Sequence, residues 1–143
     1  MSNPPQRFDA TSEVEVDRIA DDILELCAFS GGQFYEQGLH QDARIMFLHV
    51  VALNDKSYLG HAGLGALELL EGNDQAAREH LETAYARNPQ DIVVCGNLGE
   101  TLVRLGQPRE AARFLREAAA LDPAETDPYA NRARAILAAL PND

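Results

Sequence analysis

The chain has 143 residues, of which 24% are charged, and its 23 acidic against 12 basic side chains give a formal net charge of −11. Nucleic acids and anionic membranes select clustered Lys and Arg, so this balance argues against both kinds of partner. No apolar run approaches the roughly 20 residues of a membrane-spanning helix and no signal peptide opens the sequence, so we expect a single cytoplasmic domain without a membrane partner.

Residues 1–10 contain two prolines and are expected to be disordered. An acidic helix is predicted over residues 13–23, and Val16, Ile19 and Ile23 form its apolar face. It either ends before the next predicted helix, at residues 24–37, or continues into it. Two roles follow from its unpaired apolar face: it covers the helices that come after it, or it forms a homodimer contact.

Three units with a fixed period of 34 residues follow this segment. "GLGALELLEGNDQAAREHLETAYARNP", at residues 63–89, aligns without a gap to "NLGETLVRLGQPREAARFLREAAALDP", at residues 97–123. Leu64-Gly65 falls on Leu98-Gly99, and a weaker copy begins near Gly31. Self-similarity at one period indicates a repeat array, in which each unit buries its apolar face against its neighbours.

Each unit predicts a helix, a tight turn and a second helix. The apolar spacing places the later helices at residues 41–53, 58–71, 75–87, 92–105 and 109–121, and a last one after Asp127-Pro128. This last helix has the register of a fourth first-helix, with Arg132 and Arg134 expected on its exposed side, and is predicted to cap the array. No segment has the alternating pattern of a strand.

Glycines stand at two repeating places in the units. Gly31, Gly65 and Gly99 lie inside first helices, where glycine costs about 1 kcal/mol, and close packing against Ala43, Ala77 and Ala111 of the second helices would offset that cost. A second set is predicted to end the first helices in the left-handed conformation. Its members are Gly38, Gly72 and Gly106.

These residues resemble the tetratricopeptide repeat, whose 34-residue pattern runs through Leu-Gly, Ala, Phe and Pro. The resemblance implies an all-α superhelix of three tandem helix-turn-helix repeats, with an N-terminal helix and a C-terminal capping helix. The domain would span residues 11–143, with repeats at about 24–57, 58–91 and 92–125 and the cap at 126–140. Glu68 departs from the pattern, because it replaces an apolar residue in the second unit.

No constellation for catalysis or metal binding is predicted. Cys27, His61 and Cys95 occupy the same position in successive units, but such positions lie about two helix widths apart, whereas metal ligands must meet within about 2–2.3 Å of one ion. Cys27 and Cys95 are interpreted as small buried hydrophobes, as in a reducing compartment. We therefore expect neither an enzyme nor a bound metal or cofactor.

The fold implies that the first helices line a concave groove, which is the candidate binding site. Its predicted residues combine small positions, which make pockets, with larger apolar positions, which make walls for an extended client peptide. Asn97 and Arg104 would hold the peptide backbone or an acidic group. The alternative is that the N-terminal segment or a dimer partner covers part of this surface. The predicted groove residues are Phe29, Tyr35, Leu59, Ala62, Gly63, Ala66, Leu69, Leu70, Val93, Asn97 and Arg104.

One family with this fold is set aside on its binding residues. Co-chaperones that grip the C-terminal tails of large heat-shock proteins use a Lys, Asn and Arg clamp for a carboxylate. The corresponding positions here are Ala28, Gly32, Gly63, Val93 and Asn97, and four of the five offer no side chain that could hold it.

The chain is more similar to the class II chaperones of bacterial type III secretion, which are small, acidic proteins with an N-terminal helical segment and three repeats. "HAGLGA", at residues 61–66, resembles their "LGLGA", and the first unit ends at Asp55 without proline, as theirs does. The resemblance implies a virulence-associated chaperone that holds an apolar-anchored segment of a translocator client in the groove. A general repeat scaffold for another protein complex remains the alternative. The chaperone interpretation maps client contacts onto Phe29, Tyr35, Leu59, Ala66, Leu69 and Leu70.

Overall fold

The computed structural model describes residues 1–2 and 10–141, and this part of the chain contains seven α-helices and no strand. The all-α repeat fold is therefore confirmed, and the helix ends lie within one or two residues of the predicted ones from the second helix onward. The helices are α1 (Ala10–Glu36), α2 (His40–Leu53), α3 (Tyr58–Glu71), α4 (Asp74–Arg87), α5 (Ile92–Arg104), α6 (Pro108–Ala120) and α7 (Pro128–Ala139).

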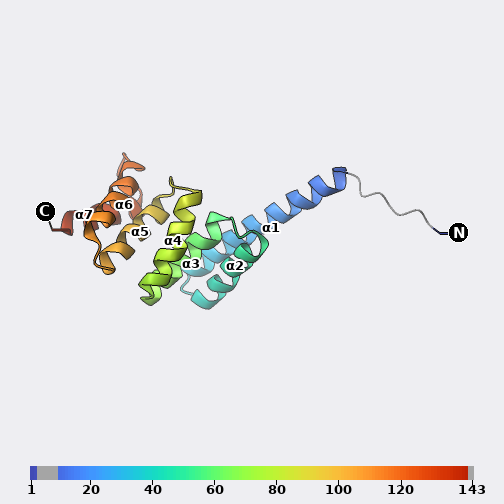
Figure 1. Ribbon diagram of the computed structural model, residues 1–143, viewed down its shortest axis with the longest axis horizontal. Coiled ribbons are helices and arrows are strands. Elements are labelled where there is room, and N and C mark those ends of the chain that lie inside the picture. Colours follow the sequence, from blue (N-terminus) through green and yellow to red (C-terminus); the bar gives the residue numbers. More distant parts are fainter. Residues whose placement is uncertain (3–9, 142–143) are drawn as a thin grey trace.

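The first two predicted helices are one continuous helix, α1, because no proline and no turn interrupt the chain between them. The N-terminal half of α1 extends away from the other helices (Figure 1). Val16, Ile19 and Ile23 are 60%, 50% and 46% exposed, so the prediction that this segment covers the first unit is wrong within one chain. The predicted disorder of residues 1–10 falls mainly on residues 3–9, which lie outside the described residues.

The helices of the repeats, including the C-terminal part of α1, stack in two layers. Each of α1, α3 and α5 packs against the helix that follows it, which gives the three predicted pairs, and each pair contacts the next. Contacts also connect α1 to α3, α3 to α5 and α5 to α7, so the first helices of successive units form one layer together with α7 (Figure 1). This layer carries the groove-lining positions.

The helical glycines permit close helix contacts, and the atoms nearest to them belong to large side chains of the second helices. A Cβ built on Gly65 would lie 2.6 Å from Cγ of Leu81, and one on Gly99 would lie 2.6 Å from Cγ of Leu115. The alanines predicted to face these glycines, Ala43, Ala77 and Ala111, are all fully buried. The predicted left-handed turns are confirmed, because φ is +76°, +82° and +75° at Gly38, Gly72 and Gly106.

Glu68, the residue that departs from the repeat pattern, joins two units. Its carboxylate accepts hydrogen bonds from Arg44 of α2 at 2.6 Å and from Asn73 at 2.8 Å. Burial by itself would raise the pKa of Glu68, but these two hydrogen bonds outweigh burial and lower it. The position is thus polar because α2 and the turn before α4 supply partners for a charged group.

Arg134 fastens α7 to the end of α6, and the prediction that its side chain is exposed is wrong. The half-buried guanidinium donates to the carbonyl oxygen of Ala119 at 2.9 Å and to that of Asp122. The Asp122 carboxylate in turn accepts from the backbone N–H of Asp127, the N-cap residue of α7, at 3.0 Å. These bonds add a charged donor to two carbonyls that also accept from backbone N–H groups, and so connect α7 to the end of α6.

Candidate functional site

A pocket of about 280 Å³ opens on the layer formed by α1, α3, α5 and α7. Its residues come from four helices that are far apart in sequence, so the stacking of the repeats creates it. The lining residues are Tyr35, Ala66, Leu69, Leu70, Asn97, Glu100, Arg104, Tyr129 and Arg132.

The structure brings six of the predicted groove residues together in this pocket. They are close because the same positions of successive first helices face the same side of the stack. The six are Tyr35, Ala66, Leu69, Leu70, Asn97 and Arg104.

Five predicted residues lie outside the pocket. Leu59 lines a separate hollow of about 400 Å³, beside the first part of α1 and the turn before α3. A Cβ built on Gly63 would lie 2.4 Å from the Phe47 ring, so this position faces α2. Phe29 is 66% exposed on α1, while Ala62 and Val93 are half-buried and do not line the pocket.

Three lining residues are not among the predicted binding residues: Glu100, which stands at a groove position of the third unit's first helix, and Tyr129 and Arg132. The last two belong to α7, which was interpreted only as a cap. The available signal was the register of α7, because a helix that continues the first-helix layer also continues its groove face. Arg132 binds Glu100 through two parallel hydrogen bonds, from Nε at 2.9 Å and from Nη2 at 2.8 Å.

The floor of the pocket is apolar and its rim is polar. Ala66 leaves space between Leu69, which is buried in the core, and Leu70, which is 52% exposed. On the rim, Arg104 pairs with Asp74 at 3.0 Å and donates to the carbonyl oxygen of Leu69 at 3.2 Å. Exposed ion pairs of this kind add little stability, so their main effect is to orient the rim.

Two uncharged polar groups face the pocket. Burial, followed by the nearby Tyr129 and Glu100, raises the pKa of Tyr35, so its phenol stays neutral and can donate a hydrogen bond. Among the described residues the side-chain amide of Asn97 has no hydrogen-bond partner. An amide offers both a donor and an acceptor, which are the groups that an extended backbone requires.

Across the part of the chain that the structure describes, no three His, Cys, Asp or Glu side chains are grouped so that they could hold a metal ion. His61 and His80 form a pair with Nδ1 atoms 3.2 Å apart, but neither lines the pocket. None of the described helices combines the length and the apolar character that spanning a bilayer requires.

Comparison with known proteins agrees with this architecture. Residues 68–137 match the family model of the tetratricopeptide repeat. Among curated proteins, none matches the chain in sequence.

Several solved structures share the fold. PcrH of Pseudomonas aeruginosa, in complex with the chaperone-binding region of PopD, is 25% identical over 83% of this chain and 91% of its own, with a TM-score of 0.70. The type III secretion translocator chaperone SycD of Yersinia enterocolitica, in an alternative dimer, is 22% identical over 82% of this chain and 91% of its own, also with a TM-score of 0.70. The OM64 repeat domain of Arabidopsis is 19% identical over 83% of this chain and 97% of its own, with the same TM-score.

Proposed function

Because the chain is a tetratricopeptide-repeat protein that resembles the translocator chaperones of type III secretion, we propose that it is a chaperone of this class. It holds an extended segment of a translocator client by an apolar anchor residue. The fold and family are non-enzymatic, so the chain acts by binding. The place of action is the cytoplasm, where the client must be kept from aggregating before export.

The observation that carries this proposal is the composition of the pocket. Ala66, Leu69 and Leu70 give the pocket an apolar side, and Asn97 and Tyr35 place uncharged polar groups beside it. A buried apolar side chain supplies most of the binding energy in such a site, and backbone hydrogen bonds fix the peptide's direction.

Apart from Gly63, which faces α2, the remaining predicted groove residues extend the binding surface beyond the pocket. Phe29, Leu59, Ala62, Gly63 and Val93 belong to the same helix layer, and Phe29 is mostly exposed. A client segment longer than the pocket would contact this part of α1, α3 and α5 on both sides of the central anchor. The structure of PcrH with a region of PopD supports this mode, because a repeat protein of similar fold is bound there to a translocator segment.

We also propose that the protein forms a homodimer through the N-terminal part of α1. The exposed apolar face of this helix supports the contact, since an uncovered stripe of this kind favours association. The pocket does not depend on it, because the projecting part of α1 is not among the lining residues.

A general scaffold for another complex is the second candidate function. It is favoured by the OM64 domain, which matches the fold as well as the translocator chaperones do. The two functions differ in the partner: a chaperone of this class binds a protein with apolar transmembrane segments, whereas a scaffold joins folded proteins.

Photo-cross-linking in the native host separates the two candidates. A photoreactive residue at Leu70, in the pocket, is compared with one at Leu48, an equally exposed leucine on α2. The chaperone function predicts cross-links from Leu70 to one apolar segment of a membrane-active protein. Cross-links mainly from Leu48, or to folded domains without such segments, would favour the scaffold.

A further inference from the structure

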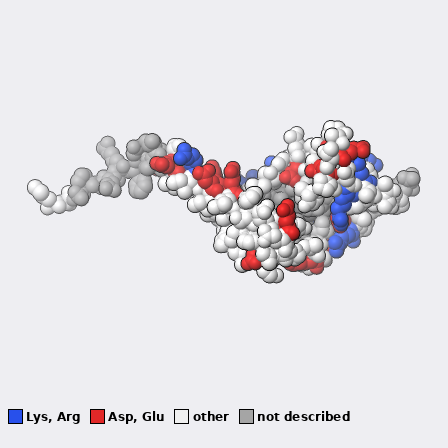
Figure 2. All heavy atoms as spheres, turned by 180° about the vertical axis from the view of Figure 1, so that it is seen from behind, with Lys and Arg blue, Asp and Glu red and all other residues white. Residues whose placement is uncertain are grey.

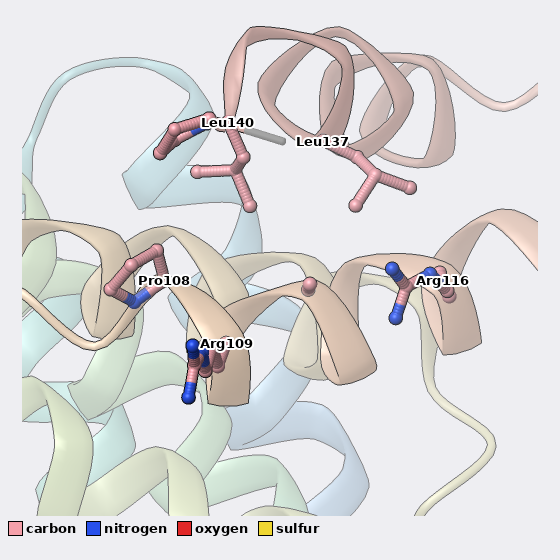
Figure 3. A pocket seen from close by; sticks show the side chains of 7 residues that line it. Pro108, Arg109, Arg116, Leu137 and Leu140 are labelled. Carbon is pink, nitrogen blue, oxygen red and sulfur yellow. The ribbon is translucent and has the colours of Figure 1, made fainter. Parts of the chain in front are cut away.

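A second hollow, of about 390 Å³, lies between α6 and α7 at the C-terminal end of the stack. Figure 3 shows Leu137 of α7 and Leu140, the residue after this helix, directed toward α6, whose Pro108 lies on the opposite side. Arg109 and Arg116 project from α6 along this hollow (Figure 3). We call it the α6–α7 groove.

The α6–α7 groove is the position that a further helix of the array would occupy. One unit earlier, α4 contacts the second helix of the following unit, because Arg78 of α4 donates to the side-chain oxygen of Gln107, just before α6, at 3.1 Å. The residue 34 positions after Arg78 is Ala112, which lines the groove. No helix in the described residues packs there, so the apolar side chains of α7 remain half-buried.

The charge of the groove specifies its occupant. Within the described part of the chain, Arg116 has no ion-pair partner, and Arg109 lies on the same face of α6. A helix that fills the groove must therefore present an apolar stripe bordered by acidic side chains.

The N-terminal arm, residues 13–26 of α1, is such a helix. Val16, Ile19, Ile23 and Leu26 form its exposed apolar stripe, at the spacing of one helical face. The arm is strongly acidic, and Figure 2 shows mostly acidic side chains along it, whereas Lys and Arg gather toward the other end of the molecule. Its charged residues are Glu13, Glu15, Asp17, Arg18, Asp21, Asp22 and Glu25.

The position of the acidic residues also fits the groove. Glu15, Asp22 and Glu25 each immediately precede a residue of the stripe, so they lie on the same side of it, together with Arg18. An acidic residue of this row can therefore meet Arg116 when the stripe covers Leu137 and Leu140.

We propose that the N-terminal arm of one copy docks into the α6–α7 groove of a second copy. The arm and the groove lie at opposite ends of the molecule, so a chain cannot fill its own groove (Figure 1). The contact joins two different surfaces and either closes reciprocally into a dimer or continues into larger assemblies. This inference names the surface that meets the arm and does not depend on client binding.

Sedimentation velocity of the full chain over a range of concentrations tests the contact. Arg116→Glu should weaken self-association at least about tenfold, because the introduced carboxylate would face the acidic arm. Asp22→Arg should weaken it similarly, and high salt should weaken the wild-type contact. Arg113→Glu, the same charge change on the same helix but outside the groove, is the control and should leave association unchanged.

Mixing the two weakened variants gives the decisive result. Arg116→Glu and Asp22→Arg each associate poorly alone, but in a mixture the altered arm of one meets the altered groove of the other with opposite charge, so association should return. Circular dichroism of each variant alone checks that both fold. A monomeric wild type, or self-association that Arg116→Glu leaves intact, would overturn the proposal; the latter result would indicate contact between two arms.

Discussion

Replacing Gly65 by leucine tests whether the seam between α3 and α4 is as tight as the repeat register requires. A Cβ at this position would lie 2.6 Å from Cγ and 2.8 Å from Cδ2 of Leu81, and 3.3 Å from the backbone nitrogen of the same residue. Leu81 is fully buried and packs in the core that joins the second and third units, so its side chain has no free space to enter.

Two effects of opposite sign determine the result. Removing glycine from a helix interior gains about 1 kcal/mol. Overpacking a buried contact costs typically about 1–3 kcal/mol, and a leucine adds three more carbon atoms beyond the Cβ that already clashes. Because the Cβ alone already clashes, we expect the upper end of this cost, which gives a net loss of about 2 kcal/mol and a fall in melting temperature of about 4–8 °C.

Thermal and urea denaturation, followed by circular dichroism, measure this loss. Gly99→Leu should lose a similar amount, because its Cβ would also lie 2.6 Å from a buried leucine, Leu115. Gly32→Ala is the control: no atom lies within 4 Å of its Cβ, so we expect stabilisation of about 0.5–1 kcal/mol. If Gly65→Leu melts like the wild type, or if Gly32→Ala loses as much, the register is wrong.

Three further predictions concern the array. Arg134→Ala should destabilise the protein by about 1–3 kcal/mol in urea denaturation, because the Ala119 and Asp122 carbonyls and the Asp122 carboxylate lose a charged hydrogen-bond donor; an unchanged midpoint would show that α7 docks without this contact. Burial, and then the nearby His61, lower the pKa of His80, so stability should be full above about pH 6.5 and fall as the pH drops below it. His80→Gln should flatten this pH dependence of stability. If the variant loses stability as steeply as the wild type when the pH falls, another group causes the dependence. Alkylation of the folded protein should label Cys27 well before Cys95, whose buried thiol has its pKa raised to about 11; equal rates would contradict the burial.

The fold was predictable because its signals are local and repeated. Glycines at 34-residue intervals mark the turns, and each takes the left-handed conformation. The apolar period then fixes which face of each helix is buried. Six groove residues followed from the same register, because equivalent positions in stacked units must face the same side.

Features that depend on the exact placement of two helices were not predictable. Helical spacing gave the buried face that contains both Ala77 and Leu81, but only the crossing geometry puts Leu81 against Gly65. The partners of Arg132 and Arg134 follow from how α7 rests on α5 and α6, which no periodicity encodes. The projecting part of α1 has the pattern of any amphipathic helix, so the sequence could not tell whether it folds back.

Client binding by an Ala66→Glu variant tests the central claim most directly. Ala66 lies on the apolar floor of the pocket, so a glutamate there would place a carboxylate where the client's anchor is buried. Isothermal titration with the client segment identified by cross-linking should show affinity weakened by at least about 30-fold, equivalent to about 2 kcal/mol, with a near-normal melting curve. Arg113→Glu, whose side chain is largely exposed on α6, should bind like the wild type. Undiminished binding by the Ala66 variant together with a loss in the Arg113 variant would place the client on the other face of the stack and contradict the account.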